Sequence, residues 1–191
     1  MLQQESIRLL RCLNLNRRFS MGTPIQKLIA DYQDLHKFLL ENGQVSASIE
    51  VNEHYRKILL FSCASYYETR IVEIIKAFVI SKSSDPRISE FVNNKAIQRQ
   101  YHTYFDWKQT NNVNTFLGLF GPEFKEEVLA EIKASDNLAN QIKAFMIIGS
   151  ERNKMAHGNF LEYKLDKTFD ELVELQEKAN HFIEYLERKF Q

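Results

Sequence analysis

The chain has 191 residues, and its 25 Lys and Arg residues balance its 25 Asp and Glu residues, so the formal net charge is zero. This balance excludes a strongly basic nucleic-acid-binding domain, and any contact with nucleic acid must come from a local patch. The chain contains six glycines and three prolines, a scarcity that argues against a turn-rich β protein and for long helices.

The first twenty residues carry four arginines among leucines, without the apolar segment and cleavage site of a targeting peptide. We interpret residues 1–20 as an N-terminal extension outside the fold and residues 21–191 as one helical domain. No uncharged stretch reaches the ~18 residues that span a membrane, so we expect no membrane contact. Cys12 and Cys63 show no metal-ligand spacing, a usage that fits a reducing cytoplasm, where we place the protein.

Helix signals fill the first half of the chain. The residues from Thr23 to Gln26 form a capping box with proline at the first helical position, and they predict a helix that ends at Gly43. A long helix is predicted over about residues 49–81, and its largely apolar middle makes it the central buried helix. Asp85 and Pro86 start a shorter helix.

The second half continues the helical pattern. Residues 98–114 read as irregular, polar and aromatic, and a short helix follows from Pro122. A second long helix is predicted from about Asp136 to His157, and a last one begins with a capping box at Thr168. The sequence therefore predicts an all-α fold, an up-and-down bundle of four main helices with short extra helices between the second and third.

The helix predicted to end at His157 turns from apolar to polar without changing face. Ile142 and Gly149 lie on one line along it, and continuing that line in helical steps reaches Asn153 and His157, with Arg152 on the neighbouring line. A solvated face would place its charges opposite the apolar stripe. Polar groups on an inward or partner-facing surface are costly unless they are paired or used.

These residue types suit phosphate chemistry. Arginine presents a planar fork of donors to phosphate oxygens, and histidine titrates near neutral pH and transfers protons. RNA carries its own nucleophile, the 2′-hydroxyl, so an arginine and a histidine together can cleave RNA without a metal. We expect no cofactor and no metal site, because the remaining histidines are scattered singly without ligand spacing.

A known motif has the same arrangement. Arg152 and His157 are separated by four residues, with Asn153 directly after the arginine and Gly158 directly after the histidine. This pattern, near the end of the third long helix, resembles the catalytic motif of HEPN ribonucleases. Residues 65–70, 116–121 and 151–158 are similar to the branch of that superfamily called RiboL-PSP HEPN, and the similarity extends from about Met21 to the C-terminus.

The resemblance implies a helical bundle that forms a homodimer, with the two copies of the motif meeting in a cleft at the interface. It implies a metal-independent endoribonuclease that cuts single-stranded or tRNA-like RNA and often leaves a 2′,3′-cyclic phosphate. Arg152 and His157 correspond to the defining catalytic pair of the family and Asn153 to its preferred polar residue. Glu68 and Lys154 are further supporting candidates.

The resemblance also implies partners and an alternative. Many members are toxins or phage-defence effectors, so an antitoxin or a regulatory protein is an expected partner. Other HEPN domains have lost activity and serve as RNA-binding, nucleotide-binding or dimerisation modules, which is the alternative function.

Structural roles are open for the same residues. His157 can act as a cation at its own helix terminus, where a positive charge is favoured, while Arg152 pairs with Glu151 or another acid. Glu68 can orient Arg152 or His157 across the bundle, or it can form an internal ion pair with Arg70 or Arg152.

Residues 99–108 mix aromatic and basic side chains. Such a mixture can stack RNA bases and hold phosphates, and it is also typical of a connector whose aromatic rings are buried. The candidate RNA-contacting residues in it are Arg99, Tyr101, Tyr104, Trp107 and Lys108.

Overall fold

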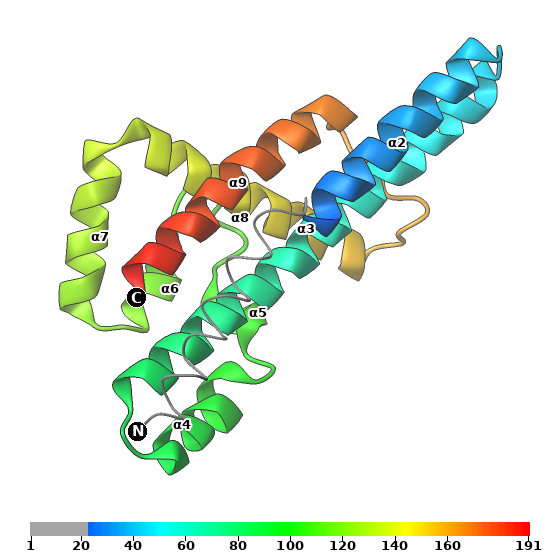
Figure 1. Ribbon diagram of the computed structural model, residues 1–191. Helices are drawn as coiled ribbons and strands as arrows, with labels where there is room; N and C mark the ends of the chain where they lie inside the picture. The colour runs from blue at the N-terminus through cyan, green and yellow to red at the C-terminus, as the bar shows by residue number, and fades with distance from the viewer. Residues whose placement is uncertain (1–22) are drawn as a thin grey trace, which may run out of the picture. The chain divides into compact units, whose positions relative to one another are not determined.

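The computed structural model describes residues 23–191, which form helices joined by loops, with no strand among them. The long helices are α2 (Pro24–Glu41), α3 (Val45–Lys82), α8 (Asp136–His157) and α9 (Phe169–Lys189). The shorter ones are α4 (Pro86–Val92), a π-helical turn η1 (Asn93–Ile97), α5 (Tyr101–Tyr104), α6 (Asn114–Gly118) and α7 (Pro122–Ala134). The predicted all-α fold, with short helices between the second and third long ones, is confirmed (Figure 1).

The predicted extension over residues 1–20 lies outside the described residues, and the single domain over 21–191 stays a prediction. The chain divides into two compact units whose boundary falls between Tyr55 and Arg56, within α3. None of the helices in residues 23–191 is long and apolar enough to cross a membrane.

The first unit is a helical hairpin of α2 and the first turns of α3. Gly43 adopts a φ of +70°, a left-handed conformation that favours glycine and turns the chain sharply. Helix α3 begins two residues later, at Val45, four residues before its predicted start. The Tyr32 hydroxyl donates to Asn52 across the hairpin at 2.7 Å.

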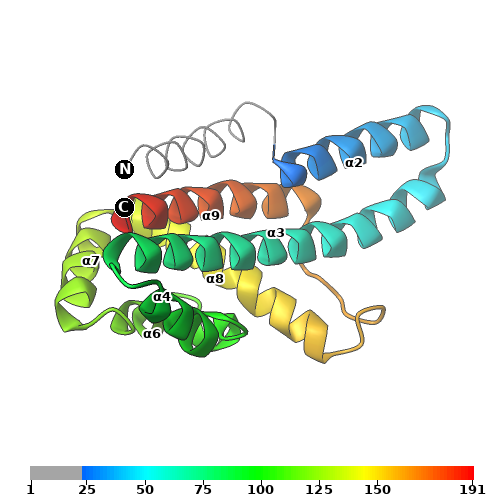
Figure 2. The same ribbon diagram turned by 60° about the horizontal axis from the view of Figure 1, so that its bottom comes forward.

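The second unit is built on α8 and α9, which lie side by side, and on the part of α3 after Tyr55 (Figure 2). Phe145 of α8 is buried and its ring lies 5.9 Å from that of Tyr67 and 5.2 Å from that of Phe182. The Tyr67 hydroxyl donates to the backbone oxygen of Gln176 at 2.9 Å, which joins α3 to α9 inside the core. These contacts fix the face that α8 presents to α3.

An aromatic cluster closes the end of the second unit where α6 and α7 meet the C-terminus. The Phe120 ring lies 5.3 Å from Phe116, 5.6 Å from Phe124 and 4.6 Å from Phe190. Phe116, Leu117 and Phe120 therefore pack into or against the core, whereas Leu119 is exposed.

The loop between α8 and α9 is held to α3 by two cations. The Arg56 guanidinium donates to the backbone oxygens of Leu165 and Lys167 at 3.1 and 2.8 Å. Lys57 Nζ donates to the backbone oxygens of Phe160 and Leu161, both at 3.2 Å. The segment that directly follows His157 is thus tied back to the bundle.

Candidate functional site

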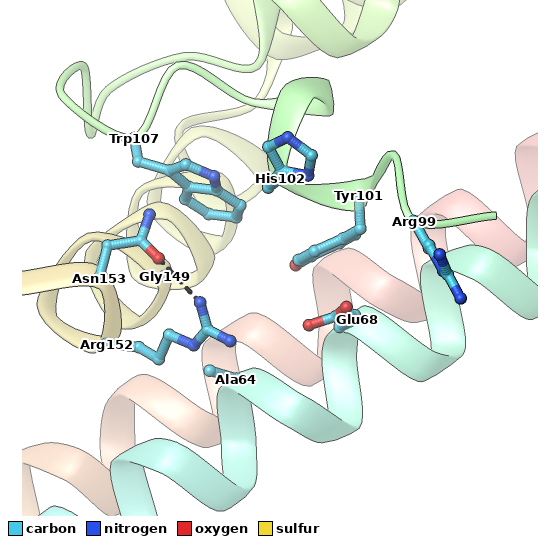
Figure 3. A pocket seen from close by; sticks show the side chains of 9 residues that line it. All are labelled: Ala64, Glu68, Arg99, Tyr101, His102, Trp107, Gly149, Arg152 and Asn153. Atoms are coloured by element: carbon cyan, nitrogen blue, oxygen red, sulfur yellow. Dashed lines mark hydrogen bonds between the residues drawn. The ribbon is translucent and has the colours of Figure 1, made fainter. Parts of the chain in front are cut away.

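A pocket of about 110 Å³ lies in the second unit where three segments of the chain meet (Figure 3). Helix α3 contributes Ala64 and Glu68, and α8 contributes Gly149, Arg152 and Asn153. The third wall is formed by the connector between α4 and α6, with Arg99, Tyr101, His102 and Trp107.

Local signals place the α8 residues at this pocket. The Ser135 side chain accepts from the Leu138 amide at 3.2 Å and starts the helix, as expected of an N-cap serine. The buried residues Ile142, Phe145 and Ile148 then set its rotation. Gly149, Arg152 and Asn153 consequently face the connector and α3.

Gly149 allows the Trp107 indole to lie directly on the backbone of α8 (Figure 3). A Cβ at this position would overlap the six-membered ring, whose Cη2 is 2.8 Å away and whose Cζ3 and Cε3 are closer still. The indole is also fixed by neighbouring rings, at 5.0 Å from Phe105 and 5.9 Å from Phe145. This contact forms one wall of the pocket and attaches the connector to the core.

Replacement of Gly149 by alanine is therefore expected to lower the free energy of unfolding by about 1–3 kcal/mol, the usual cost of overpacking. Displacement of Trp107 will also shift its fluorescence to longer wavelength, because the indole becomes more exposed. Denaturant titration followed by fluorescence measures both effects. Gly118→Ala is the matched control, because a Cβ there meets nothing within 4 Å. A Gly149→Ala protein as stable as the wild type, with unchanged emission, would contradict the packing argument.

The Arg152 guanidinium is half-buried, and most of its N–H donors have no acceptor within residues 23–191. Its Nη1 donates to Asn153 Oδ1 at 3.1 Å, and no other hydrogen bond or ion pair engages it within residues 23–191. The alternative pairing of Arg152 with Glu151 is absent there, because Glu151 accepts from Lys154 Nζ and from the Tyr163 hydroxyl, both at 2.7 Å. Burial acts to raise the pKa of Glu151, but these hydrogen bonds outweigh it and lower the pKa.

Glu68 lies on the α3 side of the pocket, half-buried, and its carboxylate forms no hydrogen bond or ion pair in the described part of the chain. The alternative pairing of Glu68 with Arg70 is wrong, because Arg70 pairs with Glu73 and Glu187 instead. The Tyr101 side chain approaches Glu68 with its hydroxyl (Figure 3). Burial raises the pKa of Tyr101, nearby Glu68 raises it further, and Arg152 lowers it. Tyr101 is therefore protonated at neutral pH and can donate a hydrogen bond.

The pocket brings together six of the residues singled out in the sequence: Glu68, Arg99, Tyr101, Trp107, Arg152 and Asn153. His157 does not line it; this residue is exposed in the last turn of α8, directly before Gly158. Its position in the last turn is also where a cation is favoured by the helix C-terminus.

The other three candidates also lie outside the pocket lining. Lys154 is exposed and pairs with Glu151 at 2.7 Å. Tyr104 is buried and donates to the backbone oxygen of Ala96 at 2.7 Å, so it packs the connector. Lys108 is exposed, and its backbone amide donates to Asp106 at 3.1 Å.

Sequence reasoning missed Ala64, His102 and Gly149 as pocket residues. A glycine inside an apolar helical stripe is a usable signal, because it often marks a close approach of another group. His102 carries no such signal, because it stands without metal-ligand spacing, and only the fold brings it to the pocket.

Comparison with known proteins shows a family relationship. A family model described as RiboL-PSP-HEPN matches residues 25–191. No curated protein and no solved structure matches the chain.

Proposed function

The chain belongs to the RiboL-PSP-HEPN family, and we propose that it is a metal-independent endoribonuclease that cleaves RNA by attack of the 2′-hydroxyl. Arg152, Asn153 and His157 are the residues to which we assign the reaction. Glu68 and Lys154 are supporting residues, and the connector residues Arg99, Tyr101 and Trp107 contact the RNA.

The reaction requires two proton transfers and stabilisation of charge at phosphorus. The 2′-oxygen loses its proton to a general base and attacks the adjacent phosphorus. The bond from phosphorus to the 5′-oxygen breaks, and that oxygen takes a proton from a general acid. The products are a 2′,3′-cyclic phosphate and a 5′-hydroxyl. His157 transfers protons, and Arg152 donates hydrogen bonds to the phosphate oxygens, where negative charge develops.

The observation that carries this proposal is that the Arg152 guanidinium forms one hydrogen bond and no ion pair within residues 23–191. An arginine that serves only the fold is normally paired, because an unpaired cation in a half-buried place is costly. Arg152 instead directs its guanidinium into an open pocket, where Asn153 orients it through a single hydrogen bond at 3.1 Å. Its remaining N–H groups suit a phosphate ligand.

A homodimer would enclose Arg152, Asn153 and His157 in one site, which a single chain does not do. His157 is exposed and does not line the pocket that contains Arg152 and Asn153, so a single chain does not enclose the histidine together with them. The side chains of Phe160 and Leu161 follow it closely in the sequence and are 37% and 74% exposed. Exposed apolar residues beside a charged motif favour an interface, and two-fold symmetry would bring two motifs together.

We assign the protein a role as a cytoplasmic toxin or phage-defence effector. An antitoxin or another regulatory protein would then restrain it, because an unrestrained ribonuclease damages its own cell. A small partner gene next to this one would support this assignment.

The test is cleavage of total tRNA and of an unstructured RNA by the purified protein in excess EDTA. We expect cleavage with 2′,3′-cyclic phosphate ends from protein that is a dimer by light scattering. Loss of cleavage in EDTA that returns with added magnesium would overturn the metal-independent reaction. A stable monomer with full activity would overturn the shared site.

The second candidate is a catalytically inactive module that binds RNA or a nucleotide, or that holds a dimer. The exposed position of His157 outside the pocket lining favours it if no dimer forms. RNA binding without cleavage by folded, dimeric protein would establish this candidate.

A further inference from the structure

The pocket presents an unpaired acceptor group opposite donor groups. The Glu68 carboxylate offers two oxygens that no side chain in residues 23–191 engages. The Tyr101 hydroxyl approaches it, and the free N–H groups of Arg152 lie on the neighbouring wall (Figure 3). A carboxylate here repels a phosphate placed directly against it, so the ligand group that contacts Glu68 must bring hydrogen-bond donors, and among the parts of RNA the bases bring N–H donors.

The four RNA bases differ in what they offer a carboxylate. Guanine carries two adjacent N–H donors, at N1 and N2, that match the two carboxylate oxygens. Adenine and cytosine place a ring nitrogen acceptor beside their amino group, and uracil places its single N–H between two carbonyl oxygens. Each of these three would set a lone pair against the carboxylate, and an unmatched buried polar group is costly.

We infer that the pocket is a guanine-binding subsite in which Glu68 accepts hydrogen bonds from N1–H and N2–H. Trp107 lines the pocket, and contact of a base with its indole tolerates every base and so adds affinity without selectivity. The Tyr101 hydroxyl donates to guanine O6, next to N1. The volume of about 110 Å³ is far below the several hundred Å³ of a site for a larger ligand, so the ribose and phosphate lie outside.

This inference rests on the proposed function, because it names the substrate class of the same site. With guanine against Glu68 and Tyr101, the attached phosphate must leave the pocket where Arg152 lies. The protein would then cleave RNA beside guanosines. Glu68 is in this view a specificity-determining residue, and Arg152 acts on the phosphate.

Trp107 provides a readout that does not require cleavage. It is the single tryptophan of the chain, and it lines the pocket, so its fluorescence reports on occupancy of this site. The experiment titrates the dimeric protein with the 3′-monophosphates of guanosine, adenosine, cytidine, uridine and inosine, with excitation at the red edge of the tryptophan band. We expect guanosine to bind about tenfold or more tightly than the other four, because one lost hydrogen bond corresponds to roughly that factor. Inosine tests the N2 donor directly, since it lacks only that amino group.

The protein-side test is Glu68→Gln, which replaces one acceptor oxygen by a donor and keeps the shape of the side chain. We expect guanosine to lose its advantage and to bind within about twofold to threefold of inosine. Glu126→Gln, an exposed acid on α7, is the matched control and should keep the wild-type preference. If Glu68→Gln does not fold by circular dichroism, the inosine comparison decides the question on the wild type alone.

The outcomes separate this inference from the proposed function. A Glu68-dependent preference for guanosine in a protein that cleaves no RNA supports the subsite and counts against the ribonuclease. Cleavage of RNA with equal binding of all five nucleotides, or with equal binding of guanosine and inosine, overturns the subsite and leaves the ribonuclease in place. Unchanged emission with every nucleotide also overturns the subsite.

Discussion

Replacement of His157 by alanine will lower the rate of RNA cleavage by about 10²–10⁴-fold, the usual contribution of a general acid or base. The fold should be unaffected, because the side chain is exposed and its imidazole forms no hydrogen bond within residues 23–191. The measurement is the initial rate of RNA cleavage in excess EDTA, together with thermal unfolding followed by circular dichroism. We expect the same Tm as for the wild type.

His54→Ala is the matched control for this variant, since His54 is an exposed histidine of α3 outside the second unit. It should cleave at the wild-type rate. A His157→Ala protein with full activity would remove His157 from the reaction. The polar end of α8 would then be explained by the favourable position of a cation at a helix C-terminus.

Mixing two inactive variants tests whether the site is shared between chains. In a mixed dimer of His157→Ala and Arg152→Ala, one site pairs the intact Arg152 of one protomer with the intact His157 of its partner. The other site of the mixed dimer has neither residue and is inactive. Random exchange makes half of the dimers mixed, and each has one active site of two, so about a quarter of wild-type activity should return. A site that needs both residues from one chain would recover nothing, because neither variant chain carries both.

The sequence predicted those parts of the fold whose signals are local. The capping boxes at Thr23 and Thr168 are present as expected, and α8 ends at His157 before Gly158. Caps and apolar periodicity act over a few residues, and these signals depend little on the rest of the fold.

The site could be predicted only in part, because its walls come from distant segments. Arg152 and Asn153 were found from one helix, but the contact of Trp107 with Gly149 depends on how the connector packs. The π-helical turn η1 was not foreseen, nor was the left-handed backbone of Arg99, with φ of 63°. Helical periodicity also placed His157 on the same side of α8 as Asn153. Periodicity gives the side of the helix on which a residue lies, but the tertiary structure decides whether another element packs against that side, and His157 is exposed.

Replacement of Arg152 by alanine is expected to lower kcat by about 10²–10³-fold, the usual effect of removing one donor to a developing negative charge. Stability should change by no more than about 1 kcal/mol, because the side chain makes a single hydrogen bond within residues 23–191, to Asn153. Arg152→Lys should recover only part of the rate. An ammonium keeps the charge but lacks the planar fork that binds two phosphate oxygens at once. The measurement is single-turnover cleavage of a short RNA, which separates the chemical step from binding.

Arg87→Ala is the control for the loss of one positive charge, since Arg87 is exposed and pairs with Asp85 at 2.6 Å. It should leave both kcat and Tm unchanged. An Arg152→Ala protein that cleaves at the wild-type rate but unfolds several kcal/mol more easily would mean that the arginine serves the fold. That result would contradict the inference drawn from its unused N–H groups, and the pocket would then be a binding site without catalysis. Loss of single-turnover cleavage at saturating protein and unchanged stability would instead identify the guanidinium as the group that acts on the phosphate, because the fold is intact and the chemical step is measured apart from binding.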